Sequence, residues 1–317
     1  KRTSTVNRIK SNDKCYIHFS KSFYVSGENI FYKIYFPTNF QSEKAIVTSS
    51  LYNADQDLVY QTRLRLAADK TINGYYKIPF EWTTGMYRMV FSVTAQKGQT
   101  TTVLAEAPIA IYNDFRTVKL SDENTAAPPT ASTEVASIAE ELKIEIQSDK
   151  KTYNYQESTR LKIKVSNAKG EGVVSSISLS VNDARLCNTE NFVYKNLYSS
   201  KDWNEPIQAD SVLLLKGKVE DFVLSKKLLN NLVLAYLPNN NKPVFATIDK
   251  NGNFLLPIPE YEGVKKIDLL DHNAKAINTQ VETIPIPNTP LQKIVYTSAI
   301  QEYLNLSAKR KKIYQIF

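Results

Sequence analysis

Apolar and polar residues alternate with a period of two along much of this 317-residue chain. Successive side chains of a strand point to opposite faces, so this period predicts strands with one buried and one solvated face. The alternation is strict at 142–146, 161–165 and 177–181. Runs of β-branched and aromatic residues, which also predict strands, occupy 30–36, 46–52, 58–66, 86–94 and 102–111.

Turn signals separate these strands. Glycine supplies the positive φ that a tight hairpin turn needs. The candidate turns are Asn73-Gly74, Thr84-Gly85, Lys97-Gly98, Lys169-Gly170 and Asn251-Gly252. Amphipathic helices do not recur between the strands, which disfavours a parallel α/β sheet. We therefore predict an all-β fold of tandem antiparallel β-sandwiches.

Changes in composition divide the chain into blocks. Residues 117–141 are polar and rich in Pro, Ala, Ser and Thr, a composition that cannot bury a core and predicts a linker. The predicted organisation is a sandwich at 1–116, that linker, a second sandwich segment with an irregular loop at 142–210, a third sandwich at 211–285, and an apolar tail at 286–317.

An internal repeat connects the first two sandwich segments. Lys21, Tyr24, Glu28, Lys33 and Ile34 recur at a constant offset as Lys150, Tyr153, Glu157, Lys162 and Ile163. We interpret the repeat as a strand, a tight turn and a second strand. The tyrosine would close one end of the sandwich and the glutamate would accept backbone N–H groups. Tyr24, Gly27, Glu28, Tyr153 and Glu157 are accordingly predicted to have structural roles.

Charge and hydropathy exclude two classes of partner. The net charge of +8 is spread over many lysines, and one run, from 309 to 312, gathers four basic residues. We interpret this run as a solvated face, because phosphate binding needs basic groups along a groove, with aromatic rings to stack on. No stretch approaches the roughly 20 apolar residues of a membrane-spanning helix. We predict neither nucleic-acid binding nor a direct membrane span.

The first segment resembles a known family. Phe23-Tyr24-Val25-Ser26-Gly27-Glu28 is similar to the Tyr-x-x-Gly-Glu opening of the second macroglobulin domain of α2-macroglobulin-like proteins. The passages at 73–80 and 85–88 also look like that family, and exported proteins of Bacteroidota open with a similar Lys-x-x-Tyr-x-x-Gly-Glu strand pair. Gln156 replaces the expected glycine in the second copy. The resemblance implies immunoglobulin-like sandwiches of macroglobulin type.

The third block carries a second resemblance. Its 217–219 and 232–234 segments, followed by Ala246-Thr247-Ile248-Asp249 and Asn251-Gly252-Asn253-Phe254, look like carboxypeptidase-regulatory-like domains, which are small transthyretin-like sandwiches. In Bacteroidota the two modules together resemble periplasmic or surface proteins of the outer membrane. The resemblance implies export and partners among envelope proteins, such as an outer-membrane β-barrel complex or a TonB-dependent transporter system.

Catalytic and metal-binding patterns are missing from the sequence. The chain has two histidines, and no HExxH, Gly-x-Ser-x-Gly or phosphate loop occurs. Cys15 and His18 have a suggestive spacing, but three residues along a strand place them on opposite faces. Neither Cys15 nor Cys187 lies in the Cys-x-Glu-Gln thioester of protease-trapping macroglobulins. We predict no catalytic site, cofactor or metal ion, and no enzyme.

Three classes of function remain open. The first is a structural or interaction subunit of an envelope assembly. The second is a ligand-binding module, for instance for glycans, with Trp203 and its polar neighbours 202–205 as the candidate group. A hydrolase ranks last, because no constellation supports it.

The apolar tail is predicted to be docked, since it is too short to form its own core. We expect it either to add strands to a preceding sandwich or to enter another domain or a partner. Its candidate interface residues are Leu291, Ile294, Tyr296, Ile300, Tyr303 and Leu304.

Overall fold

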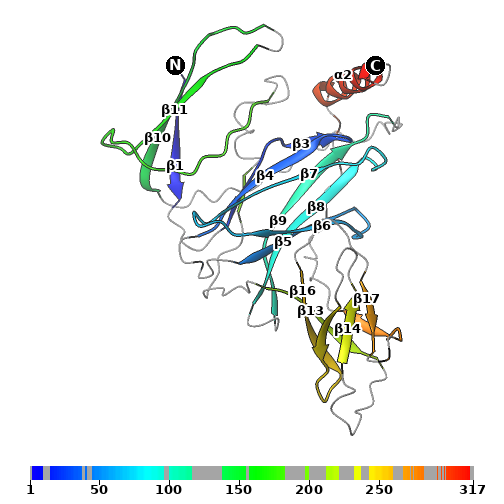
Figure 1. Ribbon diagram of the computed structural model, residues 1–317. Helices are drawn as coiled ribbons and strands as arrows, with labels where there is room; N and C mark the ends of the chain where they lie inside the picture. The colour runs from blue at the N-terminus through cyan, green and yellow to red at the C-terminus, as the bar shows by residue number, and fades with distance from the viewer. Residues whose placement is uncertain are drawn as a thin grey trace. The chain divides into compact units, whose positions relative to one another are not determined.

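The computed structural model is all-β, with several antiparallel sheets of sandwich type (Figure 1). It describes residues 2–9, 15–37, 40, 45–95, 100–115, 138–154, 157–182, 197–199, 212–220, 232–236, 243–259, 267–271, 273, 275–281, 291, 294, 296 and 298–314. The chain forms two compact units. One combines Lys1–Asn12 with Ala127–Leu179, and the other combines Asp13–Ala126 with Ser180–Phe317.

The first sandwich packs a four-stranded sheet against a five-stranded sheet. The four-stranded sheet has the order β12-β2-β4-β7 and the five-stranded sheet the order β3-β9-β8-β5-β6. The bounds are β2 Tyr16–Phe19, β3 Phe23–Val25, β4 Asn29–Tyr35, β5 Ile46–Tyr52, β6 Leu58–Arg65, β7 Thr71–Lys77, β8 Gly85–Ala95, β9 Thr100–Tyr112 and β12 Leu197–Ser199. All neighbouring strands are antiparallel except β3 and β9, which are parallel.

The period-two pattern explains this core. Along β4 the side chains of Ile30, Tyr32 and Ile34 are buried, and those between them are more exposed. They meet residues such as Met89 and Phe91 of β8 in one hydrophobic cluster. The five strands expected from β-branched and aromatic runs are therefore present as β4, β5, β6, β8 and β9.

One expected turn is wrong. Gly74 lies in the middle of β7, opposite Tyr32, and not in a hairpin turn after Asn73. A Cβ atom at Gly74 would approach the Tyr32 ring to 2.2 Å, so glycine is needed for close packing. The expected turns at Gly170 and Gly252 do form, with φ values of 83° and 86°.

The second copy of the repeat belongs to a three-stranded sheet of order β1-β10-β11, which we call the repeat sheet. Its strands are β1 Arg2–Ile9, β10 Ile138–Ser148 and β11 Leu161–Ser166. The sequence placed residues 2–9 in the first sandwich, but β1 pairs with β10. The predicted strand at 177–181 is absent: β11 is followed by a bridge at Gly172, and 173–182 contain no strand.

The third sandwich consists of two three-stranded sheets, β16-β13-β18 and β15-β14-β17. The strands are β13 Leu213–Val219, β14 Leu232–Tyr236, β15 Val244–Thr247, β16 Asn253–Ile258, β17 Asp268–Leu270 and β18 Thr279–Val281. Val233, Phe254 and Leu256 form its centre. Asp249 shapes the β15–β16 turn, where its Oδ1 accepts the N–H of Asn251 and of Asn253, both at 2.8 Å.

The tail forms a helix, α2, from Ser298 to Tyr314. The expectation that this segment adds strands is therefore wrong. Ile300, Tyr303 and Leu304 have the i, i+3, i+4 spacing of one helix face, and this face packs on the first sandwich. The second segment, expected at 142–210 with an irregular loop, also contributes β12, which is an edge strand of the first sandwich beside β2.

Candidate interaction surfaces

The first copy of the repeat forms a tight corner between β3 and β4. The Glu28 N–H donates to the Val25 carbonyl at 3.0 Å, and Gly27 between them has a φ of 84°. Glu28 Oε2 accepts the N–H of Val25 at 2.9 Å, and Oε1 accepts Lys21 Nζ at 2.7 Å. Tyr24 is 1% exposed, and its hydroxyl accepts the Lys21 N–H at 3.2 Å. One carboxylate thus holds both the turn and a lysine.

An apolar bed lies beside this corner and is covered by α2. Phe23, Val25 and Tyr112 are buried together with Leu304 of the helix. The Phe23 ring stands perpendicular to the Tyr303 ring at a centroid distance of 5.6 Å, and Tyr112 meets Tyr296 in a similar way at 5.2 Å. Edge-to-face rings at these distances attract each other in addition to burying apolar area. We call this contact the helix dock.

The corner carboxylate also binds the helix. Tyr303 Oη donates to Glu28 Oε1 at 2.6 Å and accepts from Lys21 Nζ at 3.2 Å. Burial, followed by the hydrogen bond to Glu28, raises the pKa of the Tyr303 hydroxyl. Burial lowers the pKa of the Lys21 ammonium, but Glu28 and Tyr303 outweigh this effect and raise the pKa overall. The neutral tyrosine and the charged lysine are therefore the stabilised forms.

A second polar contact fixes the last turn of α2. Lys311 Nζ lies 2.8 Å from Asp114 Oδ1, donates to the Ser26 carbonyl, and stands 5.5 Å and 5.2 Å from the ring centres of Phe80 and Phe115. The Asp114 side chain is fully buried in this contact. A lysine near a helix C-terminus is also favoured by the helix dipole. The basic run was interpreted as a solvated face, which is wrong for this one lysine.

The structure thus joins two groups of residues that the sequence analysis named separately. Tyr24, Gly27 and Glu28 form the corner, and Ile294, Tyr296, Ile300, Tyr303 and Leu304 cover it. Leu291 is half-buried but is not part of this cluster. Sequence reasoning missed Asp114 and Lys311, whose pairing across 197 positions left no local signal.

The second copy reproduces the corner without the bed. Glu157 Oε2 accepts the N–H of Asn154 at 2.8 Å, and Glu157 Oε1 pairs with Lys150. Tyr153 donates to Asp149 at 2.5 Å, and the pKa of the Asp149 carboxyl is lowered mainly by this bond. However, Thr152 and Asn154 stand where the first copy has Phe23 and Val25. This corner therefore lacks the apolar bed on which α2 packs in the first copy.

The repeat sheet exposes the face that the first sandwich buries. Ile17 pairs with Ile34 in the first copy, and Ile146 pairs with Ile163 in the same register in the second. Ile17 and Ile34 are at most 1% exposed, whereas Ile146 is 37% exposed and Ile163 is half-buried. Among the described side chains of 142–179, only Ser166 is buried. This sheet therefore has no hydrophobic core within the described part of the unit.

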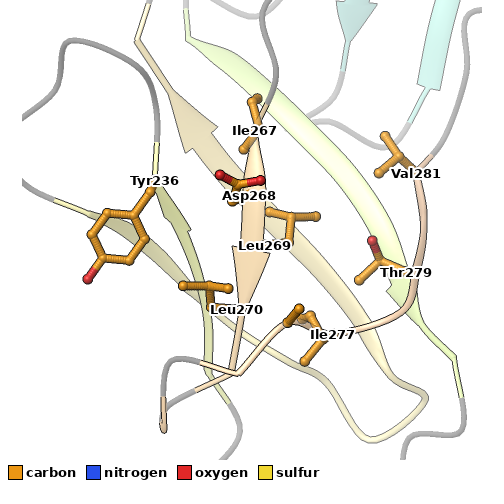
Figure 2. Close-up of a pocket in the computed structure, with 9 residues that line it drawn as sticks. Tyr236, Ile267, Asp268, Leu269, Leu270, Ile277, Thr279 and Val281 are labelled. Atoms are coloured by element: carbon orange, nitrogen blue, oxygen red, sulfur yellow. The ribbon is translucent and has the colours of Figure 1, made fainter.

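The third sandwich has an open hollow of about 510 Å³ between β17 and β18. Figure 2 shows the side chains of β17 on one side and the segment with Ile277, Thr279 and Val281 on the other. Most of the lining is aliphatic, with Tyr236 and Asp268 near it. β17 and β18 are edge strands of the two sheets, and the polar side chains of the lining are those of Tyr236, Asp268 and Thr279.

No described group favours catalysis or metal binding. Among the described residues, no cluster of three or more His, Cys, Asp or Glu could hold a metal ion. Cys15 is fully buried and burial raises the pKa of its thiol, whereas His18 is half-buried, on the face of β2 opposite the core residues Ile17 and Phe19. Trp203 with 202–205, Cys187 and His272 lie outside the described residues. None of the helices in the described part is long and apolar enough to cross a membrane.

Comparison with known proteins adds no assignment. A scan against models of protein families finds no match, and a search of curated proteins finds none either.

Proposed function

We propose that the protein is a non-enzymatic structural and interaction subunit of a bacterial cell-envelope assembly. The observation that carries this proposal is the apolar face of the repeat sheet, which is partly exposed although the equivalent face in the first copy of the repeat is buried in a closed sandwich. A sheet with one apolar face is stable only when a second layer covers that face. Within the described residues of this unit, no second layer covers that face, and Ser166 is the one buried side chain of 142–179.

The first copy indicates the chemistry of the missing layer. There the equivalent isoleucines are covered by a five-stranded sheet with Met89, Phe91 and Val93 on its inner face. A partner polypeptide with a similar apolar sheet or strand pair would complete the second copy in the same way. Val174, Ile177 and Leu179, which are 104%, 46% and 50% exposed, add to the surface that such a partner would bury.

The place of the assembly is proposed from resemblance. The macroglobulin-like opening at 23–33 and the regulatory-like pattern at 246–254 are similar to exported proteins of Bacteroidota. This supports a location in the periplasm or at the cell surface, with an outer-membrane β-barrel complex as the partner.

The test compares two neighbouring positions of β11. Ile163→Asp places a charge on the apolar face, and Lys162→Asp places the same charge on the opposite face. We expect the Ile163 variant to lose its partner in chemical cross-linking and co-purification from membrane fractions, and the Lys162 variant to retain it. Equal recovery of the partner by both variants would refute the proposal, as would a wild-type chain that is monomeric and cross-links to nothing in the envelope fraction.

A further inference from the structure

The outer face of the first sandwich carries an exposed aromatic pair. Phe31 of β4 and Tyr75 of β7 are direct cross-strand neighbours, with ring centres 6.0 Å apart. They are 51% and 67% exposed. On the same face, the next pairs in register are Lys33 with Asn73 on one side and Asn29 with Lys77 on the other. We call these six residues the aromatic platform.

Fold stability does not account for the platform. The alternate residues of the two strands, such as Ile30, Tyr32 and Ile34, already fill the core. A cross-strand aromatic pair adds only a modest stabilisation of the sheet. In return, two large rings side by side in water, one of them on the edge strand β7, are a liability for aggregation. Such exposed aromatic residues are typical of binding surfaces.

The polar neighbours indicate the charge of the ligand. None of the six platform positions is acidic, and a lysine lies on either side of the two rings along the strands. Lysine ammonium and asparagine amide groups donate hydrogen bonds, and those from lysine to a carboxylate are charge-assisted. A ligand that fits must therefore combine flat apolar faces with anionic groups.

The aromatic surface also extends along the sheet. Tyr35 lies beyond Lys33 on the same face of β4, and Lys33 Nζ stands 5.2 Å from its ring centre. Tyr35 is half-buried, so this extension is less exposed than the Phe31–Tyr75 pair. Phe31, Lys33 and Tyr35 thus follow one another along one face of β4. Such a row fits an extended polymer better than a single small molecule.

We propose that the aromatic platform binds an acidic polysaccharide, a chain of sugars that includes uronic acids. The C–H faces of the sugar rings would stack on Phe31 and Tyr75, as apolar faces do on aromatic rings. Lys33 and Lys77 would bind the carboxylates, and Asn29 and Asn73 the hydroxyls. The two lysines are too few to follow a continuous phosphodiester backbone, which favours a polysaccharide over a nucleic acid. None of the platform residues belongs to the Trp203 group considered from the sequence.

The probes are polygalacturonate as the acidic chain, dextran as a neutral chain, and a single-stranded oligothymidylate. Binding of the full chain is measured by affinity electrophoresis and by titration calorimetry. Phe31→Ala and Tyr75→Ala remove the rings, and Lys77→Gln removes one charge. Phe245→Ala is the matched control, because Phe245 is 64% exposed in the third sandwich, outside the platform.

We expect the wild type and the Phe245 variant to bind polygalacturonate equally. Loss of either platform ring should weaken binding about tenfold, as for an aromatic contact at the centre of an interface. The Lys77 variant should bind less tightly and with a smaller dependence on salt. Melting temperatures should stay close to the wild-type value, since both rings are exposed and the cross-strand pair contributes at most about 1 kcal/mol.

Three results would overturn the inference. The first is a wild-type chain that polygalacturonate does not retard. The second is equal binding of dextran or of the oligothymidylate. The third is retention of polygalacturonate binding by both ring variants. The platform and the proposed envelope partner are tested on different residues, so polysaccharide binding can fail while the Ile163→Asp test succeeds, and the reverse.

Discussion

The hydroxyl of Tyr303 is predicted to stabilise the helix dock. In Tyr303→Phe, Glu28 Oε1 loses the donor at 2.6 Å, while the ring can still stack on Phe23. A hydrogen bond to a charged group contributes about 1.5 to 3 kcal/mol, and the remaining exposure of the Glu28 and Lys21 side chains, 19% and 32%, lowers this figure. We expect a loss of about 1 to 2 kcal/mol.

The assay is urea unfolding of the full chain combined with hydrogen exchange of the α2 amides. A double-mutant cycle with Glu28→Gln should give a coupling energy of about 1 kcal/mol, because Tyr303→Phe removes the donor of this hydrogen bond and Glu28→Gln removes the charge that strengthens it. Tyr236→Phe is the control, since Tyr236 is 45% exposed, and it should cost less than about 0.5 kcal/mol. A Tyr303 effect no larger than this control, or additive single effects, would refute the reasoning.

Three further predictions follow from the corner and the turns. Tyr24→Ala should cost about 3 to 5 kcal/mol in urea unfolding, because Tyr24 is fully buried, and a loss below about 1 kcal/mol would contradict this. The pKa values of Lys21 and Tyr303 are raised in the folded state, so their stabilisation is complete below about pH 10 and is lost at higher pH. The helical circular-dichroism signal of α2 should therefore decrease above this pH. In Tyr303→Phe the same signal should depend less on pH. Gly27→Ala should lower the melting temperature more than Gly170→Ala does. Both glycines have positive φ, but only a Cβ at Gly27 meets the Phe80 ring, at 2.2 Å. Equal decreases in melting temperature would show that the ring moves aside without cost.

Two local patterns predicted most of the strands: alternation where one face of the strand is solvated, and runs of β-branched and aromatic residues elsewhere. The alternation at 161–165 became β11, and the runs at 46–52 and 86–94 became β5 and β8. The corner was predicted for a similar reason. Its hydrogen bonds join residues three to seven positions apart, such as Val25 and Lys21 with Glu28.

Features that depend on distant partners could not be predicted. Asn73-Gly74 reads as a turn, and only the Tyr32 ring from another strand explains Gly74 inside β7. The alternation at 177–181 reads as a strand, but these residues form none in the structure, because strand formation also depends on a neighbouring strand that the local sequence does not reveal. The spacing of Ile300, Tyr303 and Leu304 is that of a helix face and predicts α2, although we expected this segment to add strands.

The great separation of Lys21 and Tyr303 in sequence, 282 positions, affects how the protein must be made. The first sandwich has all of its strands except β12 once Tyr112 is synthesised, but the helix that covers Phe23, Val25 and Tyr112 comes about 190 residues later, or about 10 to 40 seconds at usual rates of translation. During that interval the apolar bed is open to water and to other chains. During synthesis the protein therefore exposes an aromatic surface that is buried in the folded molecule. A chaperone that binds aromatic surfaces could bind the chain at that stage.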